Sequence, residues 1–370
     1  MKNLILTTTL LAISPILHAD PSTKSDSRAL AEELGSLRNA KVAVKLTTPK
    51  QELVYFTRAV SQEGQATLAR IAPNLKLVTG LSAAEALARA EEAHGIEGYY
   101  ASPEFLKKAT NLAWVQVMSA GVDRYINIEP LMKNDAVVLS NYRAVHGPAI
   151  ADHSMAMLLS LTRNLRFYAD QQKQENWSRG NRSTKTIALK GKTMLVIGLG
   201  GIGTEIAQRA HGFGMRIIGT RRSDSPSPKF VEKVGKPADL MKMLPEADVV
   251  VLAVPLTPET KHILAKPAFD AMKQGSYLIN IARGKVVDTT AMLAALKSGK
   301  LAGAGLDVTD PEPLTKGHPL WSQPNVIITP HMASRSEVTN TRRAALLREN
   351  LRRFAAGEPL LNVVDKKLGY

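Results

Sequence analysis

No cysteine occurs among the 370 residues. Disulfide bonds, thiolate metal sites and a cysteine nucleophile are therefore excluded, and any acid–base chemistry must use other side chains. The chain also lacks internal repeats and low-complexity tracts. The remaining composition, 44% apolar and 22% charged, is that of a globular protein. Because the length exceeds the usual size of one domain, we expect two domains with separate cores.

The apolar run at the N-terminus, residues 4–17, is too short to span a bilayer. It follows Lys2 and precedes the small residue Ala19, a pattern typical of a secretory signal peptide over residues 1–19. Residues 20–39 are polar and predict a flexible segment. We expect an exported protein, periplasmic or secreted, with no stable membrane anchor after cleavage. The alternatives are an apolar strand or uncleaved anchor at this end, and a cytoplasmic protein.

Acidic residues are outnumbered: 33 Asp and Glu stand against 48 Lys and Arg, which gives a net charge of +15. Such a surface favours anionic ligands. The densest basic run has helical spacing around apolar residues and predicts the solvated face of an amphipathic helix. Its basic residues are Arg342, Arg343, Arg348, Arg352 and Arg353. No nucleic-acid-binding motif accompanies the run, so we expect no specific nucleic-acid partner.

A glycine-rich turn, GLGGIG at residues 198–203, follows an apolar strand pattern at residues 193–197 and opens a helical pattern. A G-x-G-x-x-G run in this context is the fingerprint of a dinucleotide site. Gly198 allows the sharp turn, Gly200 lets the backbone approach a pyrophosphate, and Gly203 lets helix and strand pack closely. The helix N-terminus attracts the anion. The alternative is a glycine-rich turn that holds no ligand.

A basic pair, Arg221 and Arg222, follows the next predicted strand at residues 215–219. An NAD site normally has an Asp or Glu here for the ribose hydroxyl groups, whereas arginine suits the 2′-phosphate of NADP. Two guanidinium groups offer charge-assisted hydrogen bonds to that phosphate. We therefore expect NADP as the preferred cofactor, with NAD as the alternative. The other interpretation is that both arginines lie in a solvated loop.

Strand and helix patterns alternate along most of the chain. In the first part, strands are predicted at residues 41–45, 75–78, 114–118 and 137–139, with a helix at 82–93 that begins in a capping box of Ser82 and Glu85. In the second part, six strands are predicted at residues 193–197, 215–219, 249–254, 277–281, 302–306 and 326–329. Six strands joined by helical crossovers predict a doubly wound parallel sheet. Ligands of such sheets bind at the carboxyl ends of the strands.

One predicted helix, at residues 148–165, is too apolar for an ordinary surface helix. It contains Met155, Met157 and Leu158. We expect it to connect two domains or to be buried against a partner subunit.

Three polar side chains, Arg283, Glu312 and His331, follow the last three predicted strands. Hydride transfer between a nicotinamide and a carbonyl group needs a proton donor, a cation for an adjacent carboxylate, and a group that controls protonation of the donor. His331, Arg283 and Glu312 match these needs in that order, because a carboxylate beside an imidazole favours its charged form and fixes its tautomer. Singly, each residue has a structural explanation, but their joint placement favours catalysis.

With the motifs GLGGIG, NIARG, GLDV, PEP and TPH, the chain from about residue 41 to residue 362 resembles the NAD(P)-dependent D-2-hydroxyacid dehydrogenases. That family includes glyoxylate/hydroxypyruvate reductases and phosphoglycerate dehydrogenase. The resemblance implies two doubly wound, Rossmann-like domains with parallel sheets and an active site in the cleft between them. A substrate domain of residues 40–146 and 332–370 would surround a dinucleotide-binding domain of residues 147–331. The resemblance also implies a homodimer with the apolar helix at its interface.

The resemblance assigns roles by position. Arg283 would bind the carboxylate and carbonyl groups of the substrate, His331 would be the general acid/base, and Glu312 would pair with it. The loop SAGVD, with Ala120 and Gly121, resembles the family loop whose backbone N–H groups hold the substrate carboxylate. The cofactor site would add Gly201, Ile202, Val254, Pro255, Ala282 and Asp307 to the glycines and arginines above, with Asp307 beside the nicotinamide amide.

We therefore expect a reductase of small 2-oxo acids, or dehydrogenase of D-2-hydroxy acids, that uses no metal. His146 and His153 lack a third ligand, so packing or interface roles are expected for them. One alternative is a formate-type dehydrogenase, which Glu312 disfavours because that branch resembles a His–Gln pair. The other is a module in which a dinucleotide regulates protein association without turnover.

Overall fold

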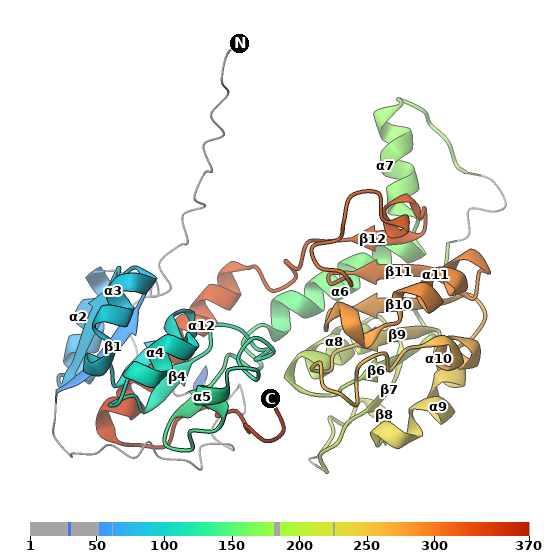
Figure 1. The fold of residues 1–370 in the computed structure, drawn as a ribbon. Coiled ribbons are helices and arrows are strands. Elements are labelled where there is room, and N and C mark those ends of the chain that lie inside the picture. Colours follow the sequence, from blue (N-terminus) through green and yellow to red (C-terminus); the bar gives the residue numbers. More distant parts are fainter. Residues whose placement is uncertain (1–28, 31–51, 61, 181–185, 225, 370) are drawn as a thin grey trace. The chain divides into compact units, whose positions relative to one another are not determined.

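The computed structural model describes residues 29–30, 52–60, 62–180, 186–224 and 226–369. The predicted signal peptide, the polar segment after it and the predicted strand at 41–45 lie outside these residues. The chain divides into two compact units. Unit 1 comprises residues 1–118, 128–140 and 340–363, and unit 2 comprises residues 119–127, 141–339 and 364–370. Each has its own parallel sheet (Figure 1).

Unit 1 has a five-stranded parallel sheet with the order β2-β1-β3-β4-β5. The strands are β1 (Leu53–Thr57), β2 (Leu75–Thr79), β3 (Gly95–Glu97), β4 (Trp114–Gln116) and β5 (Val138–Ser140). The helices are α2 (Gln62–Ile71), α3 (Ala83–Ala88), α4 (Pro103–Lys108), α5 (Glu129–Met132) and most of α12 (Glu337–Ala356). Aromatic rings fill the core: the ring of Trp114 lies 5.1 Å from that of Tyr55 and 5.2 Å from that of Phe354.

Three strands of unit 1 were predicted, and two were not. The predicted strands at 75–78, 114–118 and 137–139 correspond to β2, β4 and β5, whereas β1 and β3 are additional. The predicted capping box is confirmed, because Ser82 and Glu85 each accept a hydrogen bond from the backbone N–H of the other. The helix ends at Ala88, earlier than predicted, and a short 3₁₀ turn follows.

The prediction that the basic run of α12 is a solvated face is wrong for two of its members. Arg342 and Arg353 are buried. The guanidinium group of Arg353 donates to Glu349 Oε1 (2.7 Å) and to the carbonyl oxygen of Pro359 (2.9 Å). Glu349 is also buried, so the charge of Arg353 is compensated inside the unit.

Unit 2 has a seven-stranded parallel sheet with the order β12-β11-β10-β9-β6-β7-β8. Its strands are β6 (Thr193–Ile197), β7 (Arg216–Thr220), β8 (Val231–Gly235), β9 (Val249–Leu252), β10 (Ser276–Asn280), β11 (Leu301–Leu306) and β12 (Val326–Ile328). Its helices are α6 (Gly147–Thr162), α7 (Leu165–Lys173), α8 (Gly201–Gly212), α9 (Leu240–Met243), α10 (Lys266–Ala271) and α11 (Thr289–Lys297). This is the predicted doubly wound class of fold.

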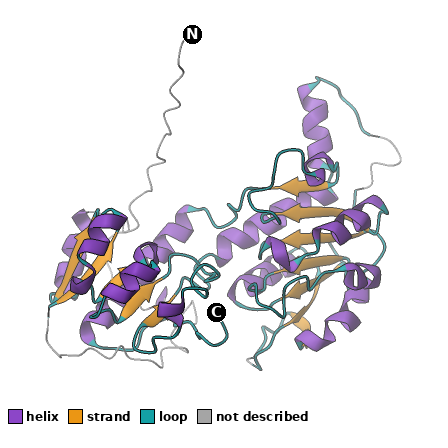
Figure 2. Cartoon of the chain, in the orientation of Figure 1, coloured by secondary structure: helices purple, strands orange, loops and turns teal. Residues whose placement is uncertain are grey.

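Helices cover both faces of this sheet (Figure 2). Alternate residues of each strand point to opposite faces. Leu195 therefore packs in a cluster with residues of α9, α10 and α11, whereas Met194 and Val196 pack in a second cluster with residues of α6 and α8. Burial on both faces explains the nearly continuous apolar sequence of the central strands.

Two local features of unit 2 differ from the predictions. The sheet has a seventh strand, β8, whose residues Glu232 and Lys233 are exposed at the sheet edge, so the apolar pattern of a buried strand is absent. The predicted helix at 148–165 corresponds to α6, which ends at Thr162, three residues earlier than predicted. Asn164, with φ of +54°, separates it from α7.

Candidate active site

The glycine-rich turn connects β6 to the N-terminus of α8. Gly198 has φ of +101°, and a Cβ atom there would lie 2.6 Å from the carbonyl oxygen of Ala253. A Cβ on Gly203 would collide with the carbonyl oxygen of Gly198. By contrast, no atom lies within 4 Å of a Cβ built on Gly200. The turn is therefore closed where helix meets strand and open at the position predicted to face a pyrophosphate, which fits a dinucleotide.

The predicted arginine pair follows β7 directly. Arg221 is held in place, because its Nη2 donates to Ser227 Oγ (3.0 Å) and its backbone N–H donates to the carbonyl oxygen of Gly235 (3.0 Å). Arg222 is exposed. Lys236, which follows β8, lies beside them, and its Nζ donates to the carbonyl oxygen of Arg222 (2.9 Å). Sequence reasoning missed Lys236 because β8 was not predicted.

Arg283 follows β10 and is positioned by a tight turn. The side chain of Asn280 accepts a hydrogen bond from the N–H of Ala282 (3.1 Å) and donates one to the carbonyl oxygen of Arg283 (3.0 Å). The guanidinium group donates to Asp123 Oδ2 through Nε (3.0 Å) and Nη2 (2.7 Å). Its Nη1 donates to the carbonyl oxygen of Ala282 (2.7 Å).

The predicted substrate loop lies beside this guanidinium group. A Cβ on Gly121 would collide with Nη2 of Arg283. The carbonyl oxygen of Ala120 accepts a hydrogen bond from Asn141 Nδ2 (2.8 Å), and Ser119 Oγ donates to the carbonyl oxygen of Gly121 (2.7 Å). Residues far apart in the sequence thus place a loop backbone and a guanidinium group side by side, an arrangement suited to a carboxylate.

His331 and Glu312 form the second predicted contact. His331 Nδ1 lies 2.7 Å from Glu312 Oε1. Both side chains are open to solvent, with 44% and 40% of their surfaces exposed. His331 has φ of +51°, a left-handed conformation that few non-glycine residues adopt. The contact occupies Nδ1, so Nε2 is the ring nitrogen that takes no part in it.

Asp307 ends β11 and is buried, with 3% of its surface exposed. Its Oδ1 accepts from Thr329 Oγ1 (2.6 Å) and from the N–H of Met332 (2.9 Å), and its Oδ2 accepts from the N–H of Ala333 (3.1 Å). The carboxylate is thus bonded to the turn that contains His331. Its predicted position beside the nicotinamide amide stays a prediction.

The other predicted cofactor residues have packing partners of their own. Val254 lies against Gly198, and the carbonyl oxygen of Pro255 accepts a hydrogen bond from Thr260 Oγ1 (2.7 Å). Ala282 is buried in the core, and Ile202 is partly buried on the first turn of α8. A Cβ on Gly201 would contact Ala144 (2.7 Å). Their cofactor roles also stay predictions.

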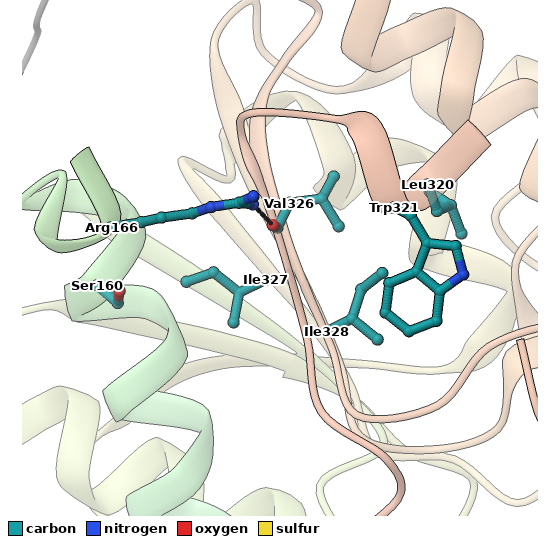
Figure 3. Close-up of a pocket in the computed structure, with 7 residues that line it drawn as sticks. All are labelled: Ser160, Arg166, Leu320, Trp321, Val326, Ile327 and Ile328. Atoms are coloured by element: carbon teal, nitrogen blue, oxygen red, sulfur yellow. Dashed lines mark hydrogen bonds between the residues drawn. The ribbon is translucent and has the colours of Figure 1, made fainter. Parts of the chain in front are cut away.

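A pocket of about 350 Å³ lies elsewhere in unit 2, beside the edge strand β12 (Figure 3). Arg166 points at this strand from α7, and its Nη1 donates to the carbonyl oxygen of Val326 (2.9 Å). The other lining residues are Ser160, Leu320, Trp321, Ile327 and Ile328. None of the predicted catalytic residues lines this pocket.

Within the described part of the chain, no group of three or more His, Cys, Asp or Glu side chains is arranged to hold a metal ion. No helix among the same residues is both long and apolar enough to cross a membrane.

The fold and the glycine-rich turn define a dinucleotide-binding oxidoreductase with an arginine and a His–Glu pair at the strand ends. Residues 155–333 match the model of the D-isomer specific 2-hydroxyacid dehydrogenase, NAD binding domain. A glyoxylate reductase of Korarchaeum cryptofilum is 36% identical over 271 residues, which cover 72% of this chain and 80% of that protein.

Two solved structures of similar sequence have a similar fold. A D-isomer specific 2-hydroxyacid dehydrogenase family protein from Aeromonas salmonicida has a TM-score of 0.74 and 34% identity, over 85% of this chain and 99% of that one. A D-isomer specific 2-hydroxyacid dehydrogenase from Xanthobacter autotrophicus, in complex with NADPH and MES, has a TM-score of 0.72 and 29% identity, over 86% and 100% of the chains. The chain belongs to the D-isomer specific 2-hydroxyacid dehydrogenase family and is an NAD(P)-dependent oxidoreductase.

Proposed function

We propose that this protein reduces small 2-oxo acids to D-2-hydroxy acids, with His331 as the general acid and NADPH as the preferred cofactor. The observation that supports this most directly is the 2.7 Å contact between His331 Nδ1 and Glu312 Oε1. Their strands, β12 and β11, are neighbours in a parallel sheet, and β10, which precedes Arg283, pairs with β11. The proton donor and the cation therefore share one edge of the sheet.

The reaction follows from these positions. A nicotinamide dinucleotide whose pyrophosphate is bound at the glycine-rich turn would supply the hydride. Arg283 binds the substrate carboxylate and stabilises the negative charge that develops on the carbonyl oxygen. His331 donates the Nε2 proton to that oxygen, and Glu312, at Nδ1, stabilises the charged imidazole and fixes its orientation. In the oxidative direction, His331 accepts the proton of the hydroxyl group.

The role of His331 is tested by His331→Gln, which keeps a polar side chain but removes the titrating imidazole. We expect kcat to fall by about 10²–10⁴-fold, with the melting temperature and NADPH affinity unchanged. A matched control is His211→Gln on α8, which changes a histidine stacked on Phe230. Near-normal turnover of His331→Gln would exclude His331 as the acid.

The preference for NADPH rests on three cations at the ends of β7 and β8. Lys236 Nζ donates to the carbonyl oxygen of Arg222, and Arg221, the neighbour of Arg222, is bonded to Ser227 and to Gly235, the neighbour of Lys236. Asp224, the carboxylate of this loop, is paired with Lys236 Nζ (2.5 Å), so its charge is compensated. The NADPH complex of the Xanthobacter autotrophicus protein supports the choice. A 2′-phosphate beside these side chains would make charge-assisted hydrogen bonds that NADH lacks.

Steady-state kinetics with both cofactors test this preference. We expect kcat/KM to be higher with NADPH than with NADH, and Arg222→Gln and Lys236→Gln each to lower the NADPH value about 10-fold, since one charged hydrogen bond contributes about 1.5–3 kcal/mol. Lys233→Gln is the control, because Lys233 pairs with Glu246 instead. A wild-type preference for NADH would overturn the proposal.

The substrate class is tested with a panel of 2-oxo acids. Glyoxylate, hydroxypyruvate, pyruvate and bulkier 2-oxo acids are compared by oxidation of NADPH. The similarity to a glyoxylate reductase makes glyoxylate the first candidate. Inactivity with every member of the panel, in protein shown to bind NADPH, would contradict reduction of 2-oxo acids.

We also propose a homodimer formed through α6, α7 and the pocket beside β12. No residue of α7 is buried, Leu165 is exposed, and 94% of the surface of Trp177 is exposed. A second copy would cover these apolar side chains. Sedimentation of the wild type and of Trp177→Ser with Leu165→Glu tests this. We expect a dimer that the double substitution dissociates, and a wild-type monomer at micromolar concentration would contradict it.

Export is a separate proposal, which rests on the sequence of residues 1–19 alone. Expression with the native N-terminus should yield a mature chain that begins near Asp20 outside the cytoplasm. Intact mass spectrometry of each cell fraction tests this. A full-length chain confined to the cytoplasm would overturn it.

A further inference from the structure

His153 is a largely buried histidine that has no part in the chemistry proposed above. It lies on α6, and 20% of its side chain is exposed. Its Nε2 is 2.9 Å from Thr329 Oγ1, and Thr329 directly follows β12, two residues before His331. The sequence predicted only a packing or interface role for His153. Its side chain instead forms a hydrogen bond with Thr329, in the segment that leads to His331.

The direction of this hydrogen bond follows from the number of protons available. Thr329 Oγ1 donates its single proton to Asp307 Oδ1, at 2.6 Å. The hydroxyl group can then only accept from His153, so Nε2 of His153 must have a proton and donate it. The side chains form one directed chain, from His153 to Thr329 to Asp307. Because Asp307 is buried, its carboxylate depends on such donors.

Asp307 also holds the backbone around His331 through several hydrogen bonds. Its carboxylate accepts from the N–H groups of Met332 and Ala333, and its backbone carbonyl oxygen accepts from the N–H of His331 (2.8 Å). His331 is left-handed, a conformation that persists only where the surroundings enforce it. The hydrogen bonds to Asp307 enforce this conformation of His331.

We infer that His153 is a positioning residue for His331, acting through Thr329 and Asp307. This inference rests on the proposed role of His331 as general acid. The Nε2–H of His153 fixes the Thr329 hydroxyl group toward Asp307, and Asp307 then fixes the backbone from which His331 projects. A small displacement of the imidazole from the carbonyl oxygen lowers the rate steeply. An apolar residue at position 153 would leave Thr329 free to rotate away from Asp307.

The first test separates kcat from binding. We expect His153→Phe and Thr329→Val each to lower kcat about 10-fold or more, with the NADPH dissociation constant unchanged. His153→Gln, which retains an N–H donor at the end of its side chain, and Thr329→Ser should recover most of the loss. The double variant His153→Phe/Thr329→Val should be no slower than the worse single variant, because both break the same chain.

Ser154→Ala is the matched control for damage to α6. Ser154 is the next residue, it is fully buried, and its Oγ donates only within the helix, to the carbonyl oxygen of Ile150 (2.7 Å). We expect this variant to retain wild-type kcat. Equal losses of kcat in Ser154→Ala and His153→Phe would overturn the inference, since they would indicate a general disturbance of the helix.

A second measurement does not depend on activity. NMR of ¹⁵N-labelled histidine should show His153 with a proton on Nε2, a signal assigned from its loss in His153→Gln. A neutral His153 with its proton on Nδ1 would overturn the directed chain.

The His331→Gln background separates this inference from the proposed function. If His153 acts through His331, His153→Phe should have little further effect on kcat where His331 is already replaced. If His331→Gln is nearly as active as the wild type, the proposed function fails. If His331→Gln is inactive but His153→Phe and Thr329→Val retain wild-type kcat, the positioning role alone fails.

Discussion

Arg283 donates two hydrogen bonds to the same oxygen of Asp123, from Nε at 3.0 Å and from Nη2 at 2.7 Å. Both side chains are more than a quarter exposed. A partly exposed pair of this kind contributes little to stability, but it fixes the plane of the guanidinium group. Asp123 thus orients the cation that we assign to the substrate carboxylate, and Gly121 leaves room for it.

Gly121→Ala should weaken substrate binding more than cofactor binding. The added methyl group would occupy the position of Nη2 of Arg283 and come within 2.7 Å of Asp123 Oδ2, so the guanidinium group must move. We expect kcat/KM for the 2-oxo acid to fall by about 10²-fold, the usual scale for loss of one donor to a developing charge. Kinetics at saturating NADPH measure this.

The control is the same substitution in an Arg283→Ala background. Without the guanidinium group the methyl group has only the carboxylate end of Asp123 to displace, so Gly121→Ala should then change kcat/KM by less than about 2-fold. The dissociation constant of NADPH should be the same in all of these variants. A loss of equal size in both backgrounds would indicate that Gly121 acts on the loop backbone and not through Arg283.

The sequence predicted the parts of the site that depend on local pattern. Gly198, Gly203 and the strand ends before Arg283 and His331 were found because turns and buried parallel strands have strong signatures. Lys236 was missed because β8 is an edge strand with exposed polar residues. Lys236 lies near Arg222 because β7 pairs with β8. This pairing cannot be predicted from the local sequence of either strand.

The hydrogen-bond partners of buried polar groups also could not be predicted from the sequence. Asp307 and His153 are 154 positions apart in the chain, and only packing of α6 against the sheet brings Thr329 between them. Arg353 was expected at the surface because its spacing fits an amphipathic helix. Its burial depends on Glu349, one helical turn earlier, which neutralises it.

Glu312→Gln should lower kcat by about 10-fold while leaving substrate KM within a factor of about 3. The amide retains an oxygen that accepts from His331 Nδ1, but it removes the negative charge that stabilises the charged imidazole. The exposure of both side chains limits the effect, because solvent screens the pair. Steady-state reduction of glyoxylate measures the change.

Asp310→Asn is the matched control for Glu312→Gln. It removes one negative charge from the same loop, two residues away, without touching His331. We expect its kcat to equal that of the wild type. If both variants lose activity equally, the net charge of the loop matters and the contact with His331 does not.

Two glycines of α8 should respond to alanine in opposite directions. A Cβ on Gly203 collides with the carbonyl oxygen of Gly198, so Gly203→Ala must push the helix from the strand. We expect a loss of about 1–3 kcal/mol in the free energy of unfolding and weaker NADPH binding. Gly212 has open space around its Cβ position, and Gly212→Ala should be neutral or stabilise by up to about 1 kcal/mol. Urea unfolding compares them, and similar stability of the two variants would contradict this account.

Tyr100 gives unit 1 a stability that should decline at alkaline pH. Its hydroxyl group donates to the carbonyl oxygen of Leu81 (3.1 Å), and burial, assisted by the charge of Glu97, raises the pKa of Tyr100 to about 12. The unfolded chain has a tyrosine pKa of about 10. Because the folded state holds the proton more tightly, the contribution is complete below pH 10 and is lost as the pH rises from 10 toward 12.

Tyr100→Phe isolates this contribution. At pH 8 the variant should be less stable by about 1 kcal/mol, because the hydrogen bond is lost. Between pH 10 and pH 11 the wild type should approach the variant, since only the wild type has this phenol to titrate. Urea unfolding of both proteins at several pH values gives the difference in their free energies of unfolding. The contributions of all other titrating groups cancel in this difference. A difference that stays constant from pH 8 to pH 11 would show that folding does not perturb Tyr100, and that the alkaline loss of stability has its origin in other groups.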